Sequence, residues 1–266
     1  MIRVTILGCG SSGGVPRLGD RWGACDPANP KNRRRRCSLL VERIEGPDVT
    51  RVLIDTGPDF VAQMLDAGVA ELQAVLYTHA HADHIHGIDD LRQIAYNMGQ
   101  IVPVWADQPT ADALMGRFGY IFETPEGSHY PPVCEMNLID GPIEVDGPAG
   151  PLRFLPFEVD HGGVPAQGFR IEGDESAVVY LPDVLTIPGA AWQIIGTPDL
   201  FICDGLRYAP HPSHAHLALA LDWIAQSGAR RGVITNMHID LDHDAVERET
   251  PAHVNAAYDG MVIDLP

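Results

Sequence analysis

The chain has 266 residues, 45% of them hydrophobic, and a formal net charge of -18 at pH 7. This length and composition are sufficient for one large α/β domain with a sizeable core, and we expect a single domain over residues 1–266. The acidic charge argues against broad attraction to nucleic acid or to an anionic membrane, because such surfaces need clustered positive charge. We therefore expect a small-molecule substrate, with no extended nucleic acid and no membrane as partner.

In chain order, short apolar runs and apolar positions three to four residues apart predict alternating strands and helices. Strands are expected at 3–7, 38–41, 51–55, 74–77, 178–181, 200–204 and 232–235, with short antiparallel strands between 141 and 171. Helices are expected at 59–67, 88–98, 110–118 and 216–226. Most predicted strands end in a polar residue, and functional side chains of layered α/β proteins commonly lie just past strand ends.

The five cysteines are odd in number and widely spaced, with no CxxC pair. That pattern is typical of reduced thiols. The first ten residues reach glycine too early for the apolar core of a signal peptide, and no run of 18 apolar residues occurs. We expect a cytoplasmic protein, and the sequence leaves open whether it is a monomer or a homodimer.

Residues 8–13 (GCGSSG) follow a predicted strand and satisfy the GxGxxG pattern of dinucleotide-binding folds. Gly14, Pro16 and Gly19 come directly after and prevent the long helix whose N-terminus would hold a pyrophosphate. We therefore reject a nucleotide-cofactor site. The glycines permit the loop to approach either another backbone or a substrate phosphate.

The only basic cluster is the run 33–36 (RRRR). Such a run is usually a solvated surface. Alternatively, one or two of its arginines clamp an anionic substrate through bidentate hydrogen bonds. Arg36 is then the candidate, because it directly precedes the Cys37-Ser38 strand. The Pro-rich segment 122–135 is irregular, and the sequence does not decide between a lid and a partner surface.

Four metal-capable side chains lie within six residues of segment 78–84 (THAHADH). Imidazole and carboxylate are good ligands for a divalent cation, and both are available deprotonated near neutral pH. In an extended segment His79 and His81 point the same way and can bind one ion. Asp83 and His84 then project in another direction and can serve a second ion. The alternative is a polar turn that caps a helix.

Three distant residues complete the pattern: His161 follows a β-rich run, and Asp183 and His238 each follow a predicted strand. With LIDTG at Asp55 and the HxHxDH segment, the whole chain resembles the metallo-β-lactamase fold superfamily of hydrolases. The resemblance implies a four-layer αββα sandwich. It also implies that Asp55 orients the histidine segment, and the following metal ligands: His79, His81 and His161 for one ion, Asp83, His84 and His238 for the other, and Asp183 as the bridge.

Within that superfamily, GCGSSGGVP, NRRRRCSLLVE and HPSHAHLALALDWI are most similar to phosphoribosyl 1,2-cyclic phosphate phosphodiesterases. Members of that group often carry several cysteines after the first glycine loop and bind a structural zinc. Here only Cys25 occupies the loop, so we expect no structural zinc, and the precise substrate stays open.

The resemblance predicts a phosphodiesterase with two divalent ions, zinc or manganese. Two cations about 3.5–4 Å apart lower the pKa of a bridging water, so hydroxide attacks the phosphodiester at neutral pH. Asp83 and His214 are the predicted catalytic residues. His214, with His216 second, is expected to contact the phosphate or protonate the departing oxygen, and Arg36 is expected to bind the substrate. The alternative for these histidines is a surface position at a helix start.

The same ligands are compatible with other reactions. Thioester and lactone hydrolysis use similar dinuclear sites, and a mononuclear iron oxygenase shares these motifs. A non-catalytic nucleotide-binding protein is the fourth hypothesis, but such proteins typically have broken ligand motifs, whereas every predicted ligand is present here. We therefore expect a metal-dependent hydrolase.

Overall fold

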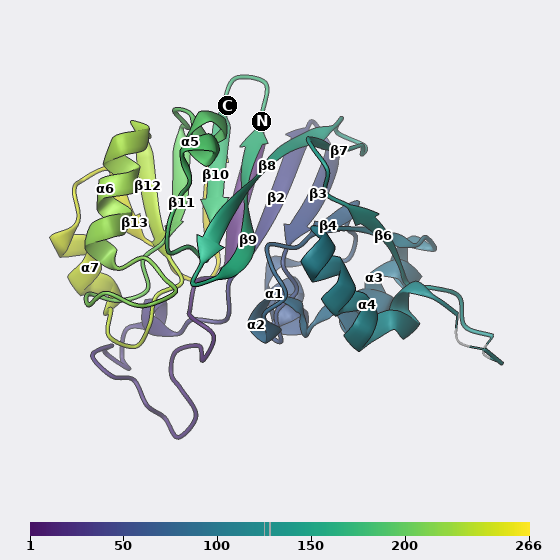
Figure 1. Ribbon diagram of the computed structural model, residues 1–266, viewed down its shortest axis with the longest axis horizontal. Helices are drawn as coiled ribbons and strands as arrows, with labels where there is room; N and C mark the ends of the chain where they lie inside the picture. The colour runs from purple at the N-terminus through teal and green to yellow at the C-terminus, as the bar shows by residue number, and fades with distance from the viewer. Residues whose placement is uncertain (125, 128) are drawn as a thin grey trace.

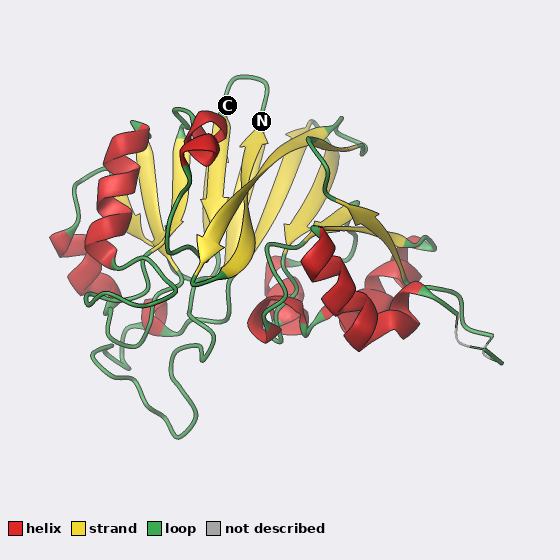
Figure 2. Cartoon of the chain, in the orientation of Figure 1, coloured by secondary structure: helices red, strands yellow, loops and turns green. Residues whose placement is uncertain are grey.

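The computed structural model describes residues 1–266 except 125 and 128. Two seven-stranded sheets face each other, and helices lie on their outer sides (Figure 1 and Figure 2). The larger apolar cluster fills the space between the sheets and continues under the helices of the second sheet, and a second cluster lies under the helices of the first sheet. The predicted α/β four-layer sandwich is therefore confirmed.

The first sheet has the order β14-β1-β2-β3-β4-β5-β6. The strands are β1 (Ile2–Gly8), β2 (Ser38–Glu45), β3 (Asp48–Ile54), β4 (Ala74–Leu76), β5 (Val102–Ala106), β6 (Cys134–Leu138) and β14 (Met261–Leu265). Strands β3 to β6 are parallel, and β14, β1, β2 and β3 pair antiparallel. Because β14 pairs with β1, the two ends of the chain lie close together (Figure 1).

The second sheet has the order β13-β12-β11-β10-β9-β8-β7. Its strands are β7 (Ile143–Val145), β8 (Leu152–His161), β9 (Val164–Glu172), β10 (Ala177–Leu181), β11 (Leu200–Asp204), β12 (Arg231–Thr235) and β13 (Val254–Ala256). Strands β10 to β13 are parallel, and β7, β8, β9 and β10 pair antiparallel. The predicted antiparallel edge between 141 and 171 is therefore confirmed.

Seven helices and two 3-10 turns are described in the chain outside residues 125 and 128. Apolar side chains of α1, α3 and α4 pack in the smaller cluster on the first sheet, and α6 and α7 cover the second sheet. The bounds are η1 (Pro30–Asn32), α1 (Phe60–Ala67), α2 (Ala82–Ile85), η2 (Ile88–Asp90), α3 (Leu91–Met98), α4 (Gln108–Phe122), α5 (Gly189–Ile195), α6 (Leu217–Ser227) and α7 (His243–Glu249).

The expected strands and helices occur at their predicted places, with one difference in the helix expected at 88–98. The segment begins as the 3-10 turn η2 and continues as α3. Strands β5, β6, β13 and β14 were not predicted: β5 (VPVWA) contains a proline and β6 (CEMNL) is polar, and both features weaken a strand signal. Residues 125 and 128 of the irregular segment 122–135 lie outside the described residues. Elsewhere in the chain, no helix is long and apolar enough to cross a membrane.

Candidate metal centre

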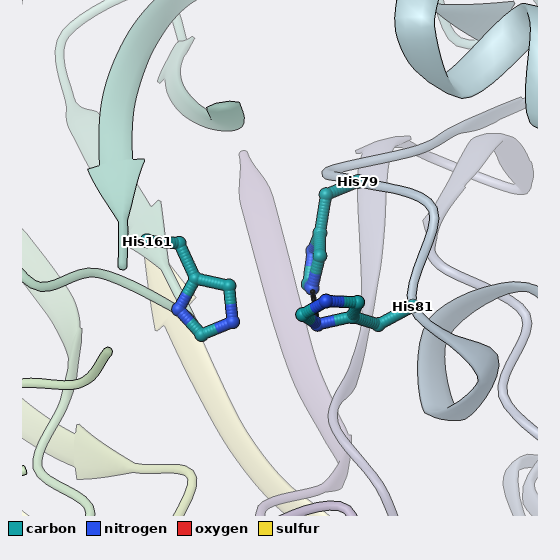
Figure 3. Close-up of side chains that lie close together, drawn as sticks. All are labelled: His79, His81 and His161. Carbon is teal, nitrogen blue, oxygen red and sulfur yellow. Dashed lines mark hydrogen bonds between the residues drawn. The ribbon is translucent and has the colours of Figure 1, made fainter. Parts of the chain in front are cut away.

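The histidine segment, residues 78–84, follows β4 and changes from extended to helical backbone at its middle. His81 is still extended, at φ -67° and ψ 149°, and is the N-cap residue of α2. His79 Nε2 and His81 Nδ1 are 2.9 Å apart, whereas Asp83 and His84 lie on the first turn of α2. Figure 3 shows the rings of His79 and His81 facing His161, which comes from the end of β8 in the other sheet. Extended backbone followed by a helical turn thus separates the two pairs, as the spacing predicts.

Asp55 fixes this segment from the end of β3. Its carboxylate is fully buried and accepts hydrogen bonds from the backbone N–H and Oγ1 of Thr78, both at 2.8 Å. Its Oδ2 is also 2.7 Å from His84 Nδ1. Because Nδ1 of His84 is held by this carboxylate, its Nε2 points toward the centre with a free lone pair once deprotonated. The orienting role implied for Asp55 is confirmed.

The second sheet contributes His161 and Asp183. His161 Nδ1 donates to the Ser213 carbonyl at 2.6 Å, which leaves Nε2 for a metal. Asp183 follows β10 and is only 4% exposed. Its Oδ2 is 3.1 Å from His84 Nε2, and its Oδ1 is 3.8 Å from His161 Nε2. The carboxylate therefore lies between ligands that come from both sheets.

Three overlapping groups have their ligand atoms within 4.8 Å of one another: His79, His81 and His161; His79, His84 and Asp183; and His161, Asp183 and His214. Oδ2 of Asp183 is buried and lies opposite Nε2 of His84 at 3.1 Å. A cation that displaces the His84 proton would be bound by both atoms, since a metal ligand must be deprotonated. The convergent imidazoles and this oxygen fit divalent metal ions.

Without a cation, the centre holds a proton on His84. Burial disfavours the charged imidazole, but the carboxylates of Asp183, Asp55 and Asp83 outweigh burial and raise the pKa of His84 well above its usual value. Burial, together with nearby His84, lowers the pKa of His79 well below its usual value. A divalent ion competes with the His84 proton for the same carboxylates, so metal binding here depends on pH.

Two further residues of the second sheet form a buried pair. Nδ1 of His214 is 2.9 Å from Oδ2 of Asp204, which ends β11 and is fully buried. Burial raises the pKa of Asp204 to about 7. Burial opposes the charge on His214, but the hydrogen bond to Asp204 outweighs it, so the pKa of His214 is raised. Because Asp204 occupies Nδ1, Nε2 is the nitrogen of His214 left to contact a ligand.

The centre opens into a cavity of about 250 Å³ lined by Ser11, Ser12, Arg17, His81, Asp83, His161, Asp183, Leu206, Arg207, His211, Ser213, His214 and His238. A neighbouring cavity of about 750 Å³ shares Ser12, Arg17 and Asp83 with it and is also lined by Arg21 and Arg36. The two cavities are therefore contiguous, and arginines line the outer one.

The glycine loop lies against the backbone of the arginine run. Gly10 N donates to the Arg35 carbonyl at 2.7 Å, and a Cβ on Gly8 would collide with the Arg36 carbonyl oxygen. Of the two roles left open for these glycines, close approach to another backbone is the one seen here. Arg34 is 2% exposed, so the run is not a solvated surface throughout.

Three further predicted site residues, Arg36, His216 and His238, lie around the two cavities or at a helix start. Nε of Arg36 pairs with Oδ2 of Asp59 at 3.0 Å, and the side chain lines the outer cavity. His216 is the N-cap residue of α6. His238 lines the metal cavity with its Nδ1 3.0 Å from Oδ2 of Asp240. Substrate binding by Arg36 and His216 and metal binding by His238 stay predictions.

Asp204, Asn236 and Arg17 were not predicted. Asn236 follows β12, and its Nδ2 is 3.3 Å from Oδ1 of Asp183 and 3.2 Å from Oδ1 of Asp204. Both Asp204 and Asn236 carry the signal that marked Asp55, a polar residue at the end of a buried strand. Arg17 has no comparable signal, because it lies in an irregular loop.

Comparison with known proteins gives a family. Residues 50–239 match the model of the β-lactamase superfamily domain. The chain belongs to the metallo-β-lactamase superfamily. This confirms the resemblance to the superfamily found in the sequence.

Two curated relatives of this protein differ in how much of their length it matches. It is 32% identical over 263 residues to an octanoyltransferase of Porphyromonas gingivalis, covering 98% of this chain but 51% of the relative. It is 32% identical over 206 residues to a ribonuclease Z of Mycobacterium sp. (strain KMS), covering 71% of this chain and 63% of the relative. The chain thus spans about half to two thirds of the length of these two curated relatives.

Among solved structures, a diphosphatase of the PhnP family superposes with a TM-score of 0.86 at 33% identity, covering 98% of this chain and 96% of that one. Zinc-bound PqqB from Methylobacterium extorquens superposes with a TM-score of 0.78 at 18% identity, covering 99% and 100%. The second similarity shows the fold alone.

Proposed function

We propose that this protein is a hydrolase, a phosphodiesterase that uses two divalent ions, zinc or manganese, on a small phosphodiester. The observation that carries the proposal is the buried Asp183 carboxylate, whose two oxygens lie between imidazoles of both sheets. His79, His81 and His161 would hold one ion, and Asp83 and His84 the other, with Asp183 shared. The similarity to a PhnP-family diphosphatase and to ribonuclease Z supports phosphoryl chemistry.

Ions held by these residues would make hydroxide available at neutral pH and would offset the negative charge that grows on the phosphorus oxygens. The protein must supply the proton for the departing oxygen. His214 is suited to this because Asp204 holds its Nδ1, raises its pKa and leaves Nε2–H to donate into the cavity. Asp204 therefore positions the imidazole and keeps it protonated.

Substrate size and charge follow from the cavity. A volume of about 250 Å³ accommodates a small phosphodiester. Arg17 lines both cavities, and its Nε is buried with no hydrogen-bond partner among the described residues. A guanidinium with an unpaired donor binds an oxyanion well, so Arg17 is the first arginine we expect to contact the substrate.

The test compares three substrates on protein loaded with manganese or zinc: a ribose cyclic phosphate, bis(p-nitrophenyl) phosphate and an acyl thioester. We expect phosphodiester hydrolysis that a chelator abolishes and either metal restores. His214→Ala should lower kcat by about 100-fold or more, which is the usual contribution of a general acid. A preference for the thioester, or one iron per chain with oxygen consumption, would contradict the proposal.

His216→Ala serves as the matched control for His214→Ala. His216 comes from the same loop but is the N-cap residue of α6, so we expect its replacement to leave kcat within about 3-fold. A large loss of kcat in His216→Ala and none in His214→Ala would show that His216, and not His214, transfers the proton.

A further inference from the structure

His211 lines the metal cavity but has no part in the proposed metal binding or proton transfer. It belongs to the loop between β11 and α6, three residues before His214. The ring centroids of the two histidines are 5.0 Å apart, and both side chains line the same cavity. A substrate that reaches one ring is therefore within reach of the other.

Ser213 fixes the orientation of the His211 ring. Its backbone N–H donates to Nδ1 of His211 at 3.3 Å, and its Oγ lies 3.2 Å from the same nitrogen. A backbone N–H can only donate, so Nδ1 must accept, and the proton of the neutral ring is assigned to Nε2. Within the described part of the chain, no hydrogen bond engages Nε2, so this N–H is available to a ligand.

The loop that carries His211 is held on both sides of this residue. Before it, Arg207 donates from Nε and Nη2 to two carbonyls of the loop, at 3.1 and 2.7 Å. After it, the Ser213 carbonyl accepts from Nδ1 of His161 at 2.6 Å. The position of His211 is therefore set by backbone contacts that exist before any substrate binds.

The loop can lie this close to His161 because the next residue is glycine. Gly162 has a left-handed backbone at φ 66°, and a Cβ there would lie 2.5 Å from Cβ of Ser213. Ser213 thus packs directly on the turn between β8 and β9, where it contacts both His161 and His211.

His211 and His214 differ in the group that holds Nδ1. The Asp204 carboxylate at Nδ1 of His214 favours the protonated ring, whereas the Ser213 N–H donates to Nδ1 of His211 and favours the neutral ring. Burial, with His214 and Arg207 nearby, also lowers the pKa of His211. A neutral imidazole donates a hydrogen bond but does not give up its proton, so the two histidines are suited to different tasks.

We propose that His211 is a catalytic residue that donates a hydrogen bond from Nε2–H to a non-bridging oxygen of the phosphodiester. This inference rests on the proposed phosphodiesterase function. Negative charge grows on these oxygens in the transition state, and a donor that is already fixed in place stabilises that charge without reorganisation. His211 then offsets charge on the phosphate, while His214 protonates the departing oxygen.

The experiment measures kcat and KM of His211→Phe and His211→Gln for bis(p-nitrophenyl) phosphate, with both variants loaded with Mn²⁺. Phenylalanine keeps a ring but has no N–H, whereas glutamine places an amide N–H near the position of Nε2 and does not titrate. We expect His211→Phe to lower kcat by about 100-fold, with a smaller change in KM, because it removes one fixed donor. His211→Gln should keep kcat within about 5-fold of the wild-type value.

His253→Phe is the matched control, because His253 is exposed and lines neither cavity of the metal centre. It should keep full activity. Manganese content is measured in every variant, and His211→Phe should retain as much as the wild-type protein. If His211→Phe does not fold, His211→Ala replaces it, with the same expected loss of kcat.

Equal losses of kcat in His211→Phe and His211→Gln would overturn the inference, because the imidazole itself would then be needed to transfer a proton. Full activity in His211→Phe would also overturn it and leave the proposed phosphodiesterase intact. Loss of manganese from His211→Phe would overturn it too, since His211 would then act on His161 through Ser213. Wild-type protein that hydrolyses no phosphodiester would refute the proposed function itself.

Discussion

Asp55 and Asn236 occupy matching places in the two sheets. Each directly follows a buried strand, β3 or β12, and each has a left-handed backbone, with φ of 66° and 59°. Asp and Asn tolerate this conformation better than other residues with a side chain. Both are buried and both contact residues of the metal centre. One carries a negative charge that accepts hydrogen bonds, and the other is a neutral amide that donates them.

That difference divides the centre into two halves. On the first sheet, the Asp55 carboxylate holds Thr78 and His84 together, so the histidine segment is fixed by charge. On the second sheet, His161 is held by a backbone carbonyl, and His214 by the carboxylate of Asp204. The residues around Asp55 should therefore govern stability, and the pair of Asp204 and His214 should govern proton transfer.

The largest effect is expected from Asp55→Ala. It leaves the charged ring of His84 and the hydroxyl of Thr78 buried without their shared partner, which costs about 3–5 kcal/mol of unfolding free energy. Asn236→Ala removes a neutral hydrogen-bonding group and should cost about 1–2 kcal/mol. Denaturant unfolding of both variants, with a chelator present so that His84 keeps its proton, measures the difference in unfolding free energy. Asp48→Ala, at the exposed start of β3, is the control. Equal losses of unfolding free energy in Asp55→Ala and Asn236→Ala would contradict the greater structural role given to Asp55.

The next effect concerns the proton on His84. Since its pKa in the metal-free folded protein lies well above 6.5, the folded state binds this proton more tightly than the unfolded state. The resulting stability is fully present below pH 6.5 and is lost as pH rises through the folded pKa. Chelated wild-type protein should therefore lose stability with rising pH, and His84→Gln should lose less of it. A steeper fall in the variant would show that another group is responsible.

The decline of activity at alkaline pH tests the role of the Asp204 and His214 pair. The carboxylate of Asp204 raises the pKa of His214 against the effect of burial. Replacing that carboxylate in Asp204→Asn lowers the pKa of His214, so activity that needs its proton should decline at a pH lower by about one unit. The measurement is kcat/KM against pH with saturating metal. If kcat/KM of the folded, metal-loaded variant declined at the same pH as in the wild-type protein, His214 would not be the general acid.

The two halves also differ in how far the sequence predicts them. His79, His81, Asp83 and His84 are adjacent in the chain, and LIDTG marks Asp55, so the first half needs no tertiary information. Asp204 and Asn236 become neighbours only because β11 and β12 pair in parallel and end at the same edge. The left-handed turn at Asn236 also breaks the alternation of side chains, so a strand pattern does not tell whether Asn236 or His238 faces inward.

The smallest effect separates two arginines beside the centre. Arg36 forms an ion pair with Asp59, whereas Arg17, which lines the metal cavity, forms no ion pair with any of the described residues. Arg17→Ala should raise KM for a phosphodiester by about 10-fold with little change in kcat, because it removes a charged contact made equally in ground and transition states. Arg36→Ala should change KM less than 3-fold, in line with a partly exposed ion pair. The reverse order would move substrate binding to the outer cavity and restore the role that the sequence gives Arg36.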